Sequence, residues 1–195
     1  FFKGCSENTR LVIFKRAGAR CMLRELSLFS GYGGMTLGLR LAGWPVQTVA
    51  YVENDPWCQR VLQARMDDGS LDRGEVHGDI REFGAERYAG GIELVSAGFP
   101  CQPHSHAGSR KGESDPRNLW PETRDVIRLV GPEWVVLENV PGIVSGSDGR
   151  QGYGVTVLGE LSELGFDARW GIHSAADAGA PHLRKRWWVL AHSKC

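Results

Sequence analysis

The amino-acid sequence predicts an α/β fold built on an open, mostly parallel, twisted sheet with helices on both faces. From Leu23 onward, short apolar runs alternate with longer segments of helical character, and this alternation is typical of strand–helix–strand units. A glycine-rich turn, SGYGG at 30–34, directly follows the first apolar run. Sheets of this class bind ligands beyond the carboxyl ends of their strands, so we expect this turn to lie at a binding site.

The first half of the predicted sheet contains two strand–helix pairs. Residues 26–29 are predicted to form a short buried strand, and residues 35–42 a helix that ends at Gly43, because glycine readily adopts the left-handed conformation that closes a helix. The pattern then repeats, with a strand predicted at 46–52 and a helix at 56–66.

The second half continues the alternation and ends with two strands that are close in sequence. Apolar runs predict strands at 92–97, 133–137, 166–173 and 187–191, and helices at 119–130 and 155–164. Residues 1–22 show no helical or strand period. We therefore expect an uncertain N-terminal extension over 1–22, followed by one domain over 23–195.

Length and composition fit one ordinary globular domain. The chain has 195 residues, of which 42% are hydrophobic and 24% charged, values typical of soluble proteins. It contains no apolar run of about 18 residues, so we expect no membrane span. The five cysteines are odd in number, widely spaced and without a C-x-x-C pair, which argues against a disulfide framework and for a reducing compartment.

Charge is balanced overall but uneven along the chain. Lys+Arg and Asp+Glu both number 23, giving a formal net charge of +0, so the total does not indicate a nucleic-acid partner. Basic residues nevertheless gather in 1–24 and in Arg184-Lys185-Arg186. The second cluster is either a solvated charge run or part of a site, and charge alone leaves both readings open.

The glycine turn and the acids after the next strands are compatible with a nucleoside site. The turn reads G-x-G-G, with Thr36 in the place of a third glycine, which argues against an NAD fingerprint. Glu53 follows Gly31 by 22 residues, where an acid can accept hydrogen bonds from ribose hydroxyls. Asp79 could accept one from an adenine amino group. Tight turns with solvated acids remain the alternative.

Cys101 lies in the segment GFPCQPHSHAG at 98–108 and has three possible roles. It could be a buried inert thiol, a metal ligand with His104 and His106, or a nucleophile. A structural zinc site needs four ligands, and no second pair lies at ligand spacing, so we expect no metal site. Glu138, at the end of a predicted strand, is either a surface acid or part of the same site as Cys101.

Six motifs follow one another in an order that resembles the catalytic half of the cytosine-C5 DNA methyltransferase family. The Pro-Cys-Gln and Glu-Asn-Val motifs carry the resemblance in combination, and it extends over residues 23–192. The motifs are LFSGYGG at 28–34, YVEND at 51–55, GDI at 78–80, GFPCQPHS at 98–105, ENVPG at 138–142 and AGAPHLRKRWWVLA at 178–191.

The resemblance implies a Rossmann-like fold of the S-adenosylmethionine-dependent methyltransferase type, with S-adenosyl-L-methionine as methyl donor. It also implies roles for single residues. The implied cofactor-binding residues are Phe29, Ser30, Gly31, Gly33, Gly34, Glu53, Asp79, Ile80, Pro100 and Leu119. The implied catalytic residues are Cys101 as nucleophile, Glu138 at the cytosine ring, and Arg184 and Arg186 beside them.

The implied chemistry accounts for these residue types. Cytosine C5 is a poor nucleophile, and addition of the Cys101 thiolate to C6 makes C5 able to attack a methyl donor. Glu138 would assist at N3, and Arg184 would favour the thiolate. A stacked base cannot reach such a pocket, so the implied partner is double-stranded DNA with a flipped-out cytosine. The segment 101–118 is expected to close over that DNA.

The sequence departs from the family pattern at three points. His182 stands in the place of the usual Gln of the late motif, and His104 in the place of an aromatic residue. The recognition region and the final helix of the family are missing, so we expect a C-terminally incomplete catalytic domain. Alternatives are a cofactor-binding remnant without turnover and a tRNA cytosine-C5 methyltransferase, with an NAD-dependent enzyme more distant. We further expect a monomer in the cytoplasm, of bacterial or phage origin, in a restriction–modification setting.

Overall fold

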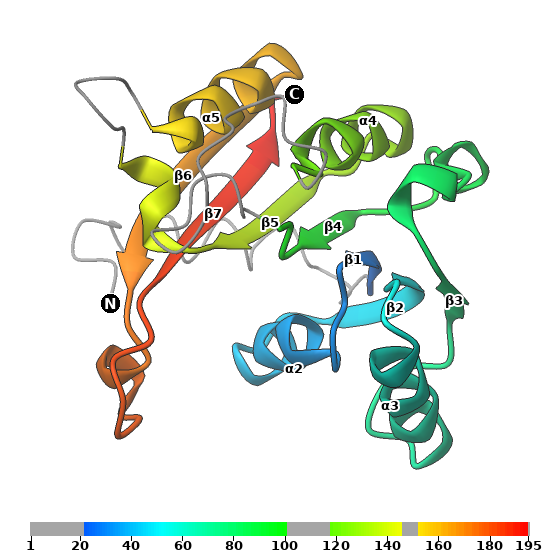
Figure 1. Cartoon of the computed structure of the whole chain (residues 1–195). Helices are drawn as coiled ribbons and strands as arrows, with labels where there is room; N and C mark the ends of the chain where they lie inside the picture. The colour runs from blue at the N-terminus through cyan, green and yellow to red at the C-terminus, as the bar shows by residue number, and fades with distance from the viewer. Residues whose placement is uncertain (1–21, 101–117, 146–151, 195) are drawn as a thin grey trace.

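The computed structural model describes residues 22–100, 118–145 and 152–194, which form a seven-stranded sheet with helices on both faces (Figure 1). The strand order is β3-β2-β1-β4-β5-β7-β6. The pairings from β3 across to β5 are parallel, whereas β7 runs antiparallel to both β5 and β6. The strands are β1 (Leu23–Leu28), β2 (Val46–Val52), β3 (Glu75–His77), β4 (Leu94–Ala97), β5 (Trp134–Asn139), β6 (Phe166–His173) and β7 (Arg186–Ser193). The predicted open, mostly parallel sheet is confirmed.

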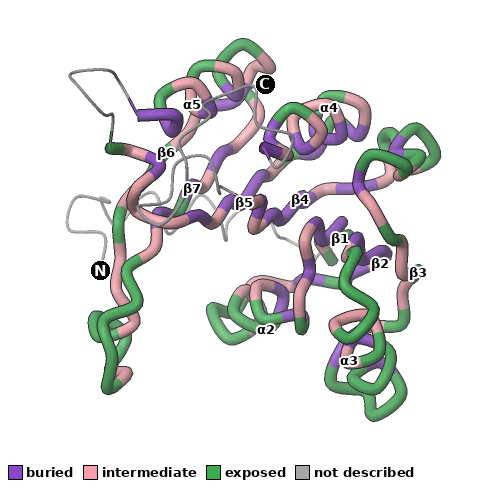
Figure 2. Tube along the Cα trace, viewed as in Figure 1, coloured by how far each residue is buried: buried purple, intermediate pink, exposed green. Residues whose placement is uncertain are grey.

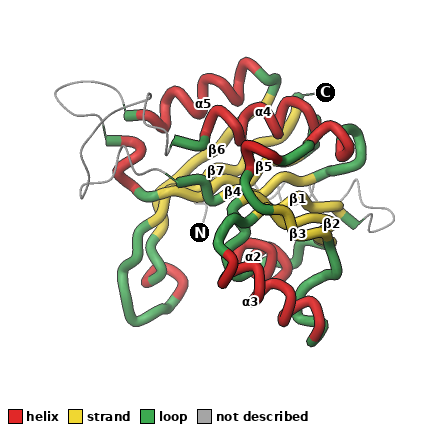
Figure 3. Tube along the Cα trace, turned by 45° about the vertical axis from the view of Figure 1, so that its right-hand side comes forward, coloured by secondary structure: helices red, strands yellow, loops and turns green. Residues whose placement is uncertain are grey.

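Two pairs of helices cover opposite faces of the sheet. Figure 3 shows α2 and α3 below the strands and α4 and α5 above them. The main core lies under α4 and α5, and burial is concentrated along the strands (Figure 2). The helices are α2 (Gly34–Leu41), α3 (Pro56–Asp67), α4 (Trp120–Val130) and α5 (Tyr153–Glu163). None of the helices within the described ranges is long and apolar enough to cross a lipid bilayer.

Local sequence signals fix the helix ends. Asp55 caps α3, because its side chain accepts hydrogen bonds from the backbone N–H groups of Trp57 at 2.7 Å and Cys58 at 3.0 Å. Pro56 occupies the first turn of α3, where a missing N–H costs nothing. A C-terminal signal is present in α4, which ends at Gly131, a residue in the left-handed conformation with φ of 62°.

The strand pair β1–β2 contains a bulge. Pairing passes from Glu25–Thr48 to Leu26–Ala50, which leaves Val49 as the extra residue. A bulge changes which face each following side chain points to, and bulges occur often beside functional sites. After this one, β1 and β2 end level with each other, because their last residues pair.

Element boundaries differ from the predictions by a few residues. The first strand begins at Leu23 and ends at Leu28, so Phe29 belongs to the turn. The strand predicted at 92–97 begins only at Leu94, and the helix predicted at 155–164 begins at Tyr153. Very short elements show no periodicity and were not predicted. They are β3 and the 3₁₀ helices η1 (Ile80–Glu82), η2 (Ala85–Tyr88), η5 (Pro141–Val144) and η6 (Ala176–Ala178).

Candidate active site

The glycine turn between β1 and α2 has a tightly constrained backbone. Phe29, Gly31 and Gly33 all have positive φ, at 53°, 54° and 79°. The left-handed backbone at Gly33 favours glycine, and a Cβ atom added there would also displace the end of the Leu71 side chain, 2.6 Å away. The Ser30 hydroxyl is buried and donates to the Ser27 carbonyl at 2.8 Å. The turn therefore presents its backbone to the carboxyl edge of the sheet.

Glu53 connects the end of β2 to this turn. Its Oε2 atom accepts a hydrogen bond from the Gly31 N–H at 2.7 Å, and its Oε1 atom accepts one from the Asp55 N–H at 2.9 Å. A carboxylate offers about four acceptor positions, so both oxygens can still accept hydrogen bonds from a ligand. Glu53 thus holds the turn in place and can bind a hydroxyl-bearing group at the same time.

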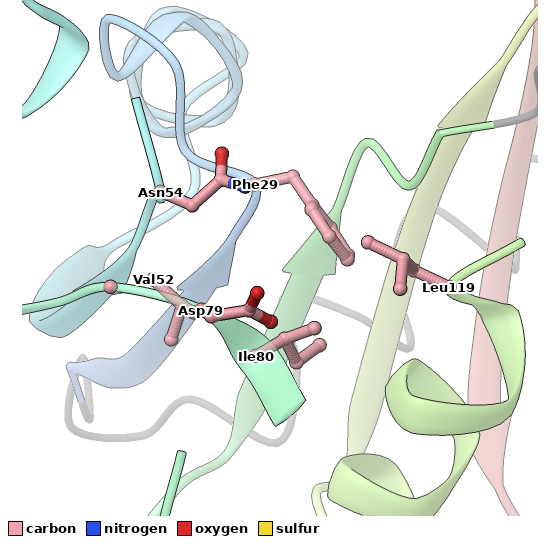
Figure 4. A pocket seen from close by; sticks show the side chains of 7 residues that line it. Phe29, Val52, Asn54, Asp79, Ile80 and Leu119 are labelled. Atoms are coloured by element: carbon pink, nitrogen blue, oxygen red, sulfur yellow. The ribbon is translucent and has the colours of Figure 1, made fainter. Parts of the chain in front are cut away.

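A pocket opens beside the turn, between the ends of β1 and β2 and the start of α4 (Figure 4). Its walls are mainly apolar, and in Figure 4 the carboxylate of Asp79 points toward the space between Phe29 and Ile80. The residues that line it are Phe29, Val52, Asn54, Gly78, Asp79, Ile80 and Leu119. An apolar lining with one acceptor at its edge matches the chemistry of a heteroaromatic ring that carries an amino group.

Asp79 is held as a carboxylate. It caps η1 by accepting a hydrogen bond from the Arg81 backbone N–H at 2.9 Å, and it also pairs with the Arg81 guanidinium. These hydrogen bonds, the side-chain ones foremost, lower the pKa of Asp79 to about 2. Asp79 therefore remains an acceptor throughout the neutral pH range.

A second group of residues lies where β5, β7 and the end of β4 meet. Glu138 of β5 forms an ion pair with Arg186 of β7 at 2.6 Å, and about a quarter of each side chain is exposed. The antiparallel direction of β7 is the cause, because it brings the first residue of β7 beside the last residues of β5. If β7 ran parallel to β5, Arg186 would lie at the amino-terminal end of β5, far from Glu138.

The segment after β4 lies against Glu138. A Cβ atom added at Gly98 would lie 3.6 Å from Glu138 Oε2, an ordinary van der Waals contact, so the backbone passes close to the carboxylate here. The buried Asn139 amide donates to the Phe99 carbonyl at 2.9 Å, which ties the end of β5 to the same segment. Cys101 follows three residues after Gly98 but lies outside the described residues, as do His104 and His106.

Residues 23–195 match the family model of the C-5 cytosine-specific DNA methylase. The chain belongs to this family. The family assignment agrees with the motifs at the turn, in β5 and at the start of β7, and it confirms the resemblance seen in the sequence.

Individual relatives of this methylase chain show the same relationship. It is 34% identical over 162 residues to the Type II methyltransferase M.NgoMIV of Neisseria gonorrhoeae, covering 83% of the chain and 49% of that protein. It is 32% identical over 179 residues to the Type II methyltransferase M.AquIA of Picosynechococcus, covering 86% and 71%. The solved structure of S. pombe Dnmt2 methyltransferase superposes with a TM-score of 0.67 and 26% identity, covering 88% and 49%. The chain therefore spans about half the length of M.NgoMIV and of S. pombe Dnmt2.

The structure brings some of the predicted site residues of the methylase chain together and leaves others apart. Phe29, Asp79, Ile80 and Leu119 share the pocket. The start of helix α2 at Gly34 follows the turn, and Pro100 is half-buried at the end of a described range. Arg184, in contrast, is exposed with φ of 31°, and the partner of Glu138 among the described residues is Arg186.

Sequence reasoning missed several residues of the candidate site. Val52, Asn54 and Gly78 line the pocket, and Asn139 ties β5 to the segment after β4. Position at the carboxyl end of a parallel strand was the signal that could have found Val52 and Asn54. Within the described residues, no cluster of three or more His, Cys, Asp or Glu side chains could hold a metal ion.

Proposed function

We propose that this chain is the catalytic domain of a DNA (cytosine-5-)-methyltransferase, which transfers a methyl group from S-adenosylmethionine to C5 of cytosine through a covalent Cys101 adduct. The Glu138–Arg186 ion pair carries the proposal, because it lies against Gly98, three residues before Cys101. An acid paired with an arginine at the end of a strand suits chemistry on a polar ring. The apolar pocket opens at the carboxyl ends of neighbouring strands of the same sheet.

The pocket and the turn fit a nucleoside cofactor. The walls formed by Phe29, Ile80 and Leu119 can sandwich an adenine ring, and Asp79 can accept from its amino group. Glu53, bonded to Gly31, can accept from ribose hydroxyls. The N–H groups at the start of α2 can receive the carboxylate of an amino acid. When bound, S-adenosylmethionine supplies an electrophilic methyl group.

The remaining roles fall to side chains of the chain itself. The Cys101 thiolate would add to cytosine C6, forming a C–S bond and making C5 the nucleophile toward the methyl group. Loss of the C5 proton to a base then restores the C5–C6 double bond as the C–S bond breaks and the thiolate leaves. A proton shared between the Glu138 carboxyl group and the ring N3 would draw electrons from C6, and Arg186 would hold the Glu138 carboxyl in position. Arg184 would add positive potential near the thiolate.

Double-stranded DNA with a flipped-out cytosine is the proposed substrate, with the protein acting as a monomer. A stacked cytosine cannot reach a carboxylate at the edge of a sheet, so the base must leave the helix. His182 and Lys185 are exposed in the segment between β6 and β7, where they can contact phosphates. In Figure 2 this segment projects away from the sheet.

A trapping experiment tests the proposal. The chain would be incubated with S-adenosylmethionine and a duplex carrying 5-fluorocytosine, in which the C5 fluorine cannot leave as a proton. We expect a covalent protein–DNA adduct that survives denaturation and disappears in Cys101→Ser. Retained adduct formation in Cys101→Ser would refute the nucleophile assignment.

Two further arms separate the alternatives. Cofactor binding without any adduct on DNA or RNA would favour a remnant that only binds cofactor. Transfer of labelled methyl groups to tRNA, with none to duplex DNA, would favour the RNA-modifying alternative. Arg186→Gln should bind the cofactor like the wild type yet form the adduct about a hundred-fold more slowly, because Glu138 would lose its charged partner.

A further inference from the structure

A buried glutamate lies beneath the site and has no role in the chemistry above. Glu25 of β1 is 0% exposed. Its Oε2 atom accepts hydrogen bonds from the hydroxyls of Thr36 at 2.8 Å and Thr48 at 2.6 Å, and its Oε1 atom accepts one from Ser96 at 2.6 Å. A buried carboxyl group is costly unless such donors surround it.

An apolar residue would be the expected choice at this position. Strands inside a parallel sheet are buried on both faces and usually read as continuous hydrophobic runs. β1 is central, with β2 on one side and β4 on the other, and four consecutive residues from Glu25 to Leu28 are buried. Three hydroxyl groups from three elements donate hydrogen bonds to this one carboxyl group. Glu25 is therefore the centre of a buried hydrogen-bonded cluster.

Each of the three hydroxyls belongs to an element that supplies part of the proposed site. Thr36 lies in the first turn of α2, directly after the glycine turn. Thr48 lies in β2, which leads to Glu53, and Ser96 lies in β4, which leads to Gly98 and the segment toward Cys101. The Glu25 carboxyl group therefore contacts α2, β2 and β4, the elements that lead into the proposed cofactor pocket and into the segment toward Cys101.

The cluster also coincides with the β1–β2 bulge. Glu25 and Thr48 are the last pair before the register shifts, and their side chains are hydrogen-bonded. After the shift, the Val52 carbonyl accepts from the Ser30 N–H at 3.1 Å, and Glu53 accepts from the Gly31 N–H. A slip of one residue would turn the following β2 side chains to the opposite face, so this register is what brings Glu53 to the turn.

We infer that Glu25 is a positioning residue, which sets the glycine turn, Glu53 and the segment after β4 in one mutual arrangement. The inference rests on the proposed cofactor site for its functional consequence, but the arrangement itself can be tested without any ligand. Replacing Glu25 by Leu removes all three acceptors. Replacing it by Gln keeps an oxygen for Thr36 and Thr48 and offers an N–H group to the Ser96 oxygen.

The first measurement is amide hydrogen exchange on the ligand-free chain. Glu25→Leu should speed exchange at the N–H groups of Ser30, Gly31 and Gly33 by about ten-fold, because their hydrogen bonds depend on the position of the turn. Glu25→Gln should restore nearly the wild-type rates. The matched control is Leu161→Ala, which makes a cavity in α5 at a residue that is also 0% exposed and should leave the turn unchanged.

Binding of S-adenosylhomocysteine, measured by calorimetry well below the unfolding temperature of each variant, gives the functional readout. Glu25→Leu should raise Kd about ten-fold or more, while Glu25→Gln and Leu161→Ala stay within about three-fold of the wild type. Exchange in Glu25→Leu equal to that in Leu161→Ala would overturn the inference. A wild-type chain that binds no cofactor would instead count against the proposed function, and the exchange result would still decide the role of Glu25.

Single hydroxyl variants keep the test open if Glu25→Leu does not fold. Thr36→Val preserves shape and removes the bond between Glu25 and α2 while Thr48 keeps its bond to Glu25, so faster exchange should be concentrated in the turn and the start of α2. Thr48→Val removes the bond between Glu25 and β2 and the longer 3.4 Å bond to the Thr36 hydroxyl, and it should affect Gly31, whose partner is Glu53 at the end of that strand. Wild-type exchange rates in both variants would refute the positioning role.

Discussion

Glu53 shows how one side chain can shape the site and bind within it. Its two oxygens already accept from the Gly31 and Asp55 N–H groups, so the glycine turn and the end of β2 are linked before any ligand arrives. Such preorganisation lowers the ordering cost of binding. The sequence predicted Glu53 as a ribose ligand, but the bond to Gly31 depends on the register of β1 and β2, which no local pattern reveals.

Replacing Glu53 by Gln should weaken cofactor binding. One of the two oxygens becomes an NH₂ group, which would face a backbone N–H donor and lose that hydrogen bond. We expect a loss of about 1.5–3 kcal/mol, or roughly ten-fold or more in Kd for S-adenosylhomocysteine. Calorimetry measures it, with Glu163→Gln, an exposed residue at the end of α5, as the control. Unchanged affinity would move the cofactor site away from the turn.

Asp79 makes a pH-dependent contribution to stability. Its pKa is about 2 in the folded chain and about 4 in an unfolded chain, so its contribution is fully present above pH 4. That contribution is lost as the pH falls from about 4 to about 2. Urea unfolding of the wild type and Asp79→Asn should therefore differ at pH 7 and converge near pH 2. A stability difference that stays constant over this range would contradict the assignment.

At the level of elements, α4 and α5 are joined by one acidic residue. Glu160 of α5 accepts from the Trp120 indole N–H at 2.6 Å and pairs with Arg124 at 3.2 Å, both on α4. Trp120 is only 1% exposed, so its indole N–H would remain buried without a partner if Glu160 were removed. This contact joins the two helices that cover one face of the sheet.

Glu160→Ala should destabilise the fold without altering the site. The cost of a buried donor without a partner predicts a loss of about 1–3 kcal/mol in the free energy of unfolding. Urea denaturation measures this loss. The matched control is Glu163→Ala, because Glu163 is an exposed residue of the same helix. Kd for S-adenosylhomocysteine should stay at the wild-type value, and a parallel loss of affinity would show that α5 supports the pocket.

Elements with strong periodicity or clear stop signals could be predicted from the sequence, and others could not. Helix α4 was predicted to within one residue, because its apolar face and Gly131 mark it clearly. The three-residue strand β3 shows no period, and the bulge at Val49 depends on pairing between strands. The motifs identified Glu138 and Arg186, yet their 2.6 Å contact required the antiparallel β7.

On the scale of the whole molecule, the sheet has a protected centre and two weaker edges. β1 and β4 are central, whereas β3 and β6 are the edge strands of the described sheet. β1 is buried over its last four residues, while β6 has several exposed ones. The site lies where the protected strands end, which gives its backbone a rigid base.

Amide exchange should follow this arrangement. We expect the slowest exchange in β1 and β4, which are hydrogen-bonded on both sides, and faster exchange in β3 and β6. The intact chain is pulse-labelled and then digested, and mass spectrometry of the peptides measures the pattern. If β3 or β6 exchanged as slowly as β1, something outside the described residues would have to protect that edge.

The central position of β1 has a consequence for folding during synthesis on the ribosome. The Glu25–Ser96 bond joins positions 71 residues apart. The second neighbour of β1, strand β4, is therefore synthesised long after β1 and β2. During that interval the N–H and C=O groups along one edge of β1 have no partner, and unpaired edges invite aggregation. A chaperone acting over this stretch should therefore raise the yield of soluble chain.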